Sequence, residues 1–232
     1  NTDPLNGIST LDLVYIQRHI LGLELITSPY KLIAADINKN NEVSAIDLIE
    51  LRKLILGIND EIPTNLSWRF IESNFIFVDP TNPWLGTLPE THVIEKLNLT
   101  EVIDFIGVKI GDVNNSVVTS LNSEEIESRN RSIELEFDYK IDQVTGFLRA
   151  DVYTKEEFEL DGMQGTFELG SIISQESLEV VSGQIEISPY QFNFGNVENG
   201  WFTFSFAEVE TKKLGKTHPL FTILINERMS GN

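Results

Sequence analysis

The stretch that decides the fold of the N-terminal part is residues 36–47, which read Asp36-Ile37-Asn38-Lys39-Asn40-Asn41-Glu42-Val43-Ser44-Ala45-Ile46-Asp47. Oxygen-bearing side chains stand at positions 1, 3, 5, 9 and 12 of this run, the spacing by which a twelve-residue loop wraps a calcium ion. A segment with apolar residues at helical spacing follows at once, over residues 48–57. The pattern therefore predicts a calcium loop that leads directly into a helix.

Every expected ligand of this loop is an oxygen. The side chains of Asp36, Asn38 and Asn40, the main-chain carbonyl of Glu42, the side chain of Ser44 (directly or through water) and the carboxylate of Asp47 make up the set. Asn41 stands at position 6, where such loops have Gly, and Asn tolerates the left-handed conformation needed there. Only two ligands are charged, which predicts weak binding, on the order of 10⁻⁴ to 10⁻³ M or somewhat tighter. The alternative is an ordinary polar turn in which the aspartates cap helices.

The loop–helix pattern occurs twice. Residues 8–22 recur as residues 43–57, and the identical pairs are Ser9/Ser44, Asp12/Asp47, Leu13/Leu48, Ile20/Ile55, Leu21/Leu56 and Gly22/Gly57. Apolar residues follow helical spacing in both copies, at Leu13, Ile16 and Ile20 and at Leu48, Leu51 and Ile55. Each copy ends in a glycine that permits the positive φ at which helices stop. We expect two helices that bury their apolar faces against each other.

The first copy has an incomplete loop. Alignment on Asp12 without gaps places Asn1, Asp3 and Leu5 at positions 1, 3 and 5, and Leu5 has no ligating atom. An insertion at Pro4-Leu5 instead makes Asn1 position 3 and Asp3 position 5, with position 1 before the first residue. We prefer the insertion, since it keeps oxygens at every ligating position that is present in this chain, and we predict Asn1, Asp3, Ser9 and Asp12 as ligands.

A third, partial match lies at Gly111-Asp112-Val113-Asn114-Asn115, which repeats the opening Asp-x-Asn of a calcium loop without its end. We interpret it as a turn that ends a strand. The alternative is that Asp112 or Asn114 contributes to a metal site.

The rest of the chain is predicted as β structure. Residues 62–121 are rich in Pro and aromatic residues, with a strand expected over residues 105–110, and a polar linker is expected over residues 122–131. Strand candidates then follow at 133–137, 147–153, 163–169, 178–181, 201–206 and 220–225, with turns at Gly146, Asp161-Gly162, Ser182-Gly183, Asn199-Gly200 and Gly215. Strands without intervening helices favour an antiparallel β-sandwich. The expected class is α+β with several domains: 1–61, 62–121 and 132–232.

Composition limits the partners. The 232 residues include 36 acidic and 17 basic ones, and the net charge of −19 excludes nucleic acid as a partner. No apolar run is long enough for a membrane helix. The chain has no cysteine, so disulfides and thiolate metal sites are excluded, and calcium is the staple we expect of an extracellular chain without disulfides.

Duplicated loop–helix units with Ser and Asp before each helix and an Ile-Leu-Gly ending resemble a dockerin, the calcium-dependent module that docks onto a cohesin. The resemblance covers residues 1 to about 60. It implies that the residues just before each helix and midway along it face the partner: Thr10, Leu11, Arg18, His19, Ala45, Ile46, Lys53 and Leu54. Core packing is an equally good interpretation of Leu11 and Ile46.

The C-terminal part resembles a cohesin-like jelly roll in the order of five short blocks, at 150–153, 163–169, 178–181, 193–195 and 219–223. The two resemblances together imply a piece of a large secreted bacterial surface protein. We predict a non-enzymatic adhesion or assembly module whose dockerin part docks onto a cohesin-like domain, in its own chain or in a separate protein. The alternative is a carbohydrate-binding or accessory module of an extracellular carbohydrate-active enzyme, with Trp68, Trp84 and Trp201 as sugar-stacking residues.

Overall fold

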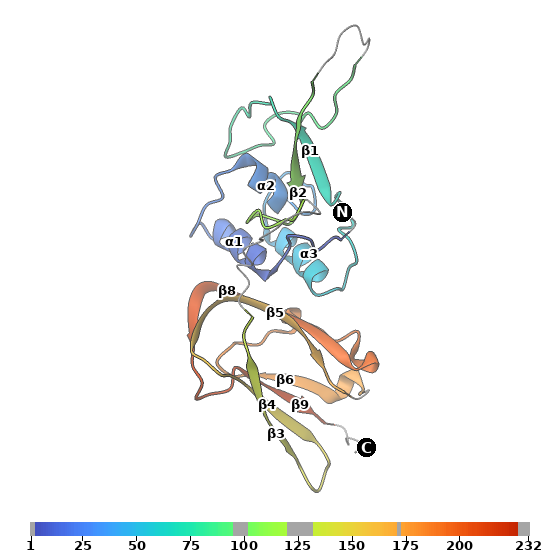
Figure 1. Cartoon of the computed structure of the whole chain (residues 1–232), viewed down its shortest axis with the longest axis vertical. Coiled ribbons are helices and arrows are strands. Elements are labelled where there is room, and N and C mark those ends of the chain that lie inside the picture. The colour runs from blue at the N-terminus through green and yellow to red at the C-terminus, as the bar shows by residue number, and fades with distance from the viewer. Residues whose placement is uncertain (1–2, 95–101, 120–131, 171–172, 227–232) are drawn as a thin grey trace. The chain divides into compact units, whose positions relative to one another are not determined.

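The structure is a computed structural model that describes residues 3–94, 102–119, 132–170 and 173–226 (Figure 1). The chain divides into two compact units. The first comprises residues 1–55 and 59–123, and the second comprises residues 56–58 and 124–232. The aromatic-rich segment, which we expected to connect two domains, thus belongs to the same unit as the N-terminal helices. The predicted linker at 122–131 lies outside the described residues.

The first unit contains three helices and one small sheet: α1 (Thr10–Ile20), α2 (Pro29–Ala35), α3 (Ala45–Ile55), and the antiparallel pair β1 (Trp68–Glu72) and β2 (Phe105–Lys109). Helix α1 packs against α3, and α2 packs against β2. Leu13, Ile16 and Leu51 are completely buried, as their spacing predicts, but Ile20 is 37% exposed. Both predicted helix-ending glycines have positive φ, 71° at Gly22 and 68° at Gly57.

Helix α2 was not predicted. It spans only seven residues and lies outside the repeated segments, so no periodicity indicated it. Pro29 at its first turn and the preceding Ser28 in an extended conformation are local starting signals. No helix in the described ranges is both long and apolar enough to cross a bilayer.

The second unit contains two antiparallel sheets. One has the strand order β3 (Leu135–Ile141), β4 (Leu148–Thr154), β9 (Phe221–Ile225), β6 (Leu178–Ser182), and the other has the order β5 (Phe158–Glu168), β8 (Trp201–Leu214), β7 (Phe192–Asn193). Short 3₁₀ turns lie at Gln175–Ser177, Pro189–Gln191 and Val197–Asn199. The α+β class is confirmed by these helices and sheets.

Phenylalanines join the two sheets. Phe202, Phe204 and Phe206 of β8 are at most 5% exposed, because residues two apart share one face of a strand. The ring of Phe221 in β9 lies 5.6 Å from that of Phe206 and 5.8 Å from that of Phe167 in β5, so both sheets contribute to one core.

One predicted turn is wrong. Asp161-Gly162 lies inside β5, where the pairing with β8 shifts register between Leu160 and Gly162. Glycine inside a strand often marks such a bulge rather than a chain reversal. The short strand β7 was not predicted, since two residues carry no alternation.

Candidate metal centre

The loop 36–47 closes around the carboxylates of its first and last residues. Asp36 accepts hydrogen bonds from the backbone N–H groups of Asn40 at 2.9 Å and Asn41 at 3.0 Å. Asp47 accepts from Asn38 N at 3.1 Å and from Ser44 N at 2.9 Å. Both aspartates are fully buried. The loop therefore wraps its backbone around two inward-facing carboxylates.

The neutral oxygens of the loop are ordered by the same backbone. Asn38 Oδ1 accepts from Asn40 N, and Asn40 Oδ1 accepts from Glu42 N, both at 3.0 Å. The sharp turns come from left-handed residues, with φ of 60° at Lys39 and 67° at Asn41. Asn41 thus has the conformation predicted from its place at position 6. Lys39 was not singled out, because its residue type gives no signal for a positive φ.

The electrostatics of the loop favour a cation. Burial raises the pKa of Asp36 above its ordinary value, and the nearby Asp47 carboxylate adds to this rise, while two backbone hydrogen bonds and Arg69 oppose it. Within the described residues, no ion pair involves Asp36 or Asp47. Arg69 instead pairs with Glu90. Two buried carboxylates in one loop without an ion-pair partner leave a negative charge that a bound cation would neutralise.

The donor chemistry fits calcium. Two carboxylates, two amide oxygens, a hydroxyl and a main-chain carbonyl form a hard, all-oxygen set of the kind Ca²⁺ takes. The part of the chain that the structure describes has no group of three or more His, Cys, Asp or Glu side chains placed to hold a metal ion. The loop 36–47 supplies two acids to the expected ligand set, and the other oxygens of that set are neutral. A cation bound here would add charge neutralisation at the start of α3.

At the calcium site predicted for the first loop, Asp12 is bonded partly by residues from outside that loop. Asp12 is fully buried, and its Oδ2 accepts from Ser9 N at 2.9 Å and from Ser9 Oγ at 3.2 Å. Its Oδ1 accepts from Val113 N at 2.9 Å and Asn114 N at 3.3 Å. Burial is the main reason that the pKa of Asp12 is raised to about 7. The partial Asp-x-Asn match at residues 112–114 was the one sequence signal for this contact.

Of the other two ligands predicted for the first loop, Asn1 lies outside the described residues. Asp3 is exposed and accepts from Leu5 N at 2.9 Å, a turn within residues 3–5. Two backbone groups from outside the turn of Asp12 also bond to it, and they belong to residues 113 and 114. These residues follow the end of β2. Asn65 was also missed, and its Nδ2 donates to the main-chain oxygen of Asp36 at 3.0 Å.

The residues predicted to face a partner divide by burial. Ala45 is exposed and Ile46 is 55% exposed, whereas Thr10 and Leu54 are each only 2% exposed. Thr10 and Leu54 are therefore interior residues, which corrects their assignment to the outer surface. The remaining four are Leu11, half-buried; Arg18, which pairs with Glu24 at 3.9 Å; His19, whose Nδ1 accepts from Ile26 N; and Lys53, which pairs with Glu50 at 3.2 Å.

This part of the chain thus contains two loop–helix units, and one of them carries an all-oxygen donor set of the kind that calcium takes. In the comparison with protein families, residues 6–56 match the dockerin type I domain, which confirms the dockerin resemblance of this segment. Among curated proteins no relative matches the chain, and among solved structures none does either.

Proposed function

We propose that this chain is a non-enzymatic, calcium-stabilised docking module of a secreted or cell-surface bacterial protein. The observation that carries the proposal is the buried pair Asp36 and Asp47, which stand at the two ends of the loop that leads into α3, inside the segment that matches the dockerin type I domain. Calcium in this loop would lock the N-terminus of α3, and α3 packs against α1. Docking would then depend on calcium because the metal fixes the two helices that present the contact surface.

Exposed apolar side chains on and beside these helices supply that surface. Ile46 and Ile49 of α3 are 55% and 54% exposed, and Leu21 and Leu23, just after α1, are 56% and 60% exposed. Exposed apolar side chains that lie together often mark a surface that binds another protein. The partner we propose is a cohesin-like β-sandwich domain, with an apolar contact patch of its own.

The second unit is our candidate for such a partner domain. Its two antiparallel sheets share a phenylalanine core, which supports a cohesin-like assignment. A second copy of the chain, or a cohesin domain of another protein, would offer the same kind of surface. We therefore propose a role in attachment or assembly, within one polypeptide or between two.

The test is association measured in calcium and in EDTA. Sedimentation of the full chain reports self-association, and a panel of purified cohesin domains on a biosensor reports docking in trans. Binding in calcium that disappears in EDTA supports the proposal. Ile46→Asp should weaken it at least tenfold, while Ile76→Asp, at an 86% exposed side chain outside the matched segment, should not. Absence of association with every probe in calcium contradicts docking.

Carbohydrate recognition is the second candidate, and one observation favours it. The rings of Trp68 and Phe70 in β1 stack at 6.3 Å between centroids, and Phe70 is 51% exposed. Exposed aromatic faces bind sugars by stacking. Trp84 lies in another segment of the first unit, and Trp201 belongs to the second unit. A polysaccharide panel separates the candidates: binding that Phe70→Ala removes supports recognition, and turnover contradicts the non-enzymatic proposal.

A further inference from the structure

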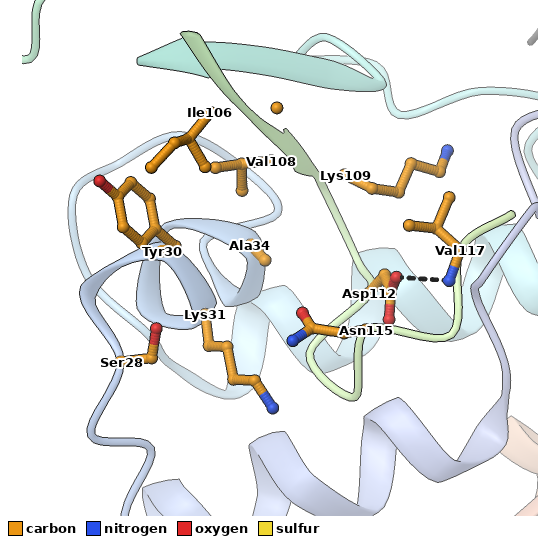
Figure 2. Close-up of a pocket in the computed structure, with 11 residues that line it drawn as sticks. Ser28, Tyr30, Lys31, Ala34, Ile106, Val108, Lys109, Asp112, Asn115 and Val117 are labelled. Atoms are coloured by element: carbon orange, nitrogen blue, oxygen red, sulfur yellow. Dashed lines mark hydrogen bonds between the residues drawn. The ribbon is translucent and has the colours of Figure 1, made fainter. Parts of the chain in front are cut away.

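The segment 112–117 repeats the hydrogen bonding of the first half of the loop 36–47. Asp112 Oδ1 accepts from the N–H four residues later, Ser116, at 3.0 Å, and Oδ2 accepts from the next one, Val117, at 2.9 Å (Figure 2). Asp36 bonds in the same way to the fourth and fifth residues after it. Asn115 has a φ of 62°, matching the left-handed residue at the fourth position of the other loop.

The segment 7–12 repeats the second half. Ser9 N and Oγ donate to Asp12 at 2.9 and 3.2 Å, and Ser44 N and Oγ donate to Asp47 at 2.9 and 3.1 Å. The other oxygen of Asp47 accepts from the third residue of its loop, Asn38, at 3.1 Å. The other oxygen of Asp12 accepts from Asn114, the third residue of the segment 112–117, although the two are 102 positions apart.

The two segments meet where a continuous loop would have its sixth and seventh residues. Ser116 Oγ donates to Gly7 O at 3.0 Å, and Asn6 exchanges two hydrogen bonds with the main chain of Val118. A Cβ on Gly7 would lie 2.6 Å from Val117 Cα, so only glycine permits this approach. The oxygens of Ser116 and Gly7 are as close as neighbouring ligands of one ion held at roughly 2.3–2.6 Å.

We infer that residues 112–117 and 7–12 together form a second calcium site, a loop whose two halves come from opposite ends of the first unit in reversed order. Its ligands are the side chains of Asp112, Asn114 and Ser116, the carbonyl of Gly7, and the side chains of Ser9 and Asp12.

An independent observation points to a ligand at this place. The side-chain oxygen of Asn114 is buried and has no hydrogen-bond partner within the described residues. A buried amide oxygen without a partner costs free energy, and a cation at the third position of the loop would offset this cost.

The charges support the same conclusion. Asp12 and Asp112 are 0% and 4% exposed, and neither carboxylate forms an ion pair within the described residues. Lys109 attracts Asp112 at longer range, but its ammonium donates to Pro4 O and Ser67 Oγ. Asp112 and Asn115 line a pocket of about 230 Å³ beside α2 and β2, which gives a cation an approach from solvent (Figure 2).

This inference rests on the proposed calcium dependence of the module, and it is tested by counting ions. The full chain is stripped with chelator, and calcium uptake is measured by titration calorimetry. We expect the natural sequence to bind two equivalents of calcium. Asn114→Ala should bind one equivalent, because its second site should bind calcium at least tenfold more weakly. Asn38→Ala is the matched variant of the loop 36–47, and it should also bind one equivalent of calcium. Asn115→Gly, at a position that does not ligate, should retain two.

Asn114→Ala is the decisive variant because the oxygen it removes makes no hydrogen bond in the described structure. Its unfolding temperature in EDTA should equal that of the natural sequence. The second site would be overturned if Asn114→Ala still bound two equivalents of calcium. It would also be overturned if this substitution lowered the melting temperature, relative to the natural sequence, by the same amount in EDTA as in calcium. If the natural sequence bound only one equivalent of calcium, and Asp36→Asn bound none, the second site alone would be overturned. No uptake at all would overturn the proposed calcium dependence as well.

Discussion

The two units of this protein bury charge very differently. Of the seven charged residues buried in the described part, six belong to the first unit and one, Asp151, to the second. Asp151 has its own partners, Arg149 Nη2 at 2.8 Å and the hydroxyl of Thr222. In the first unit, Asp12, Asp36, Asp47 and Asp112 have no ion pair within the described residues. The second unit is stabilised by its own apolar core, whereas the first unit buries carboxylates whose charge a bound cation would neutralise.

The largest effect should come from the phenylalanine core of the second unit. Phe206 is fully buried among three other rings. Phe206→Ala removes these contacts and leaves a cavity, and should destabilise this unit by about 3–5 kcal/mol. Urea denaturation should give the same loss in calcium and in EDTA. Tyr190→Ala is the control, since an exposed ring should contribute less than about 0.5 kcal/mol. A calcium-dependent loss in Phe206→Ala would contradict the contrast between the units.

Next in size is the loss of charge in the contiguous loop. Asp47→Asn keeps an oxygen in place but removes one of two charged ligands, so calcium should no longer stabilise this site. The loss is about 2.7 kcal/mol at a calcium concentration one hundred times the dissociation constant. Thermal melts at several calcium concentrations measure it. His19→Ala should retain the full calcium response, because His19 bonds to Ile26 and not to the loop. An unchanged response in Asp47→Asn would contradict the metal site.

The smallest of these effects concerns the junction of the two half-loops. Gly7→Ala places a methyl group against the backbone of Val117 at a φ of 80°, and should cost about 2 kcal/mol while it weakens calcium binding at one site. Gly22→Ala has the same left-handed strain, with φ of 71°, but no atom within 4 Å, so about 1 kcal/mol is expected and both ions should stay bound. Equal calcium uptake by the two variants would show that the junction does not matter for the metal.

The sequence predicted what depends on neighbouring residues. The loop 36–47 and the helices α1 and α3, which begin just after the Ser of each Ser-x-x-Asp run, follow from spacing within twelve to twenty residues, and β8 follows from alternate phenylalanines. Helix α2 is too short to show periodicity. The surroundings of Asp12 were missed because its partners lie 101 and 102 positions away, and a spacing motif assumes a continuous chain. Asp-x-Asn at residues 112–114 was visible, but only the fold brings it to Asp12.

The measurement that tests this account most directly is thermal unfolding of the full chain in calcium and in EDTA, with each unit observed separately. Trp68 and Trp84 lie in the first unit and Trp201 in the second, so tryptophan fluorescence of Trp201→Phe reports the first unit alone. Calcium should raise its unfolding temperature by roughly 10 °C or more, since each bound ion contributes about 2.7 kcal/mol at one hundred times its dissociation constant. The transition of the second unit, followed through Trp201 in the Trp68→Phe/Trp84→Phe variant, should not move. Superimposable melts of the first unit in calcium and EDTA would contradict the account.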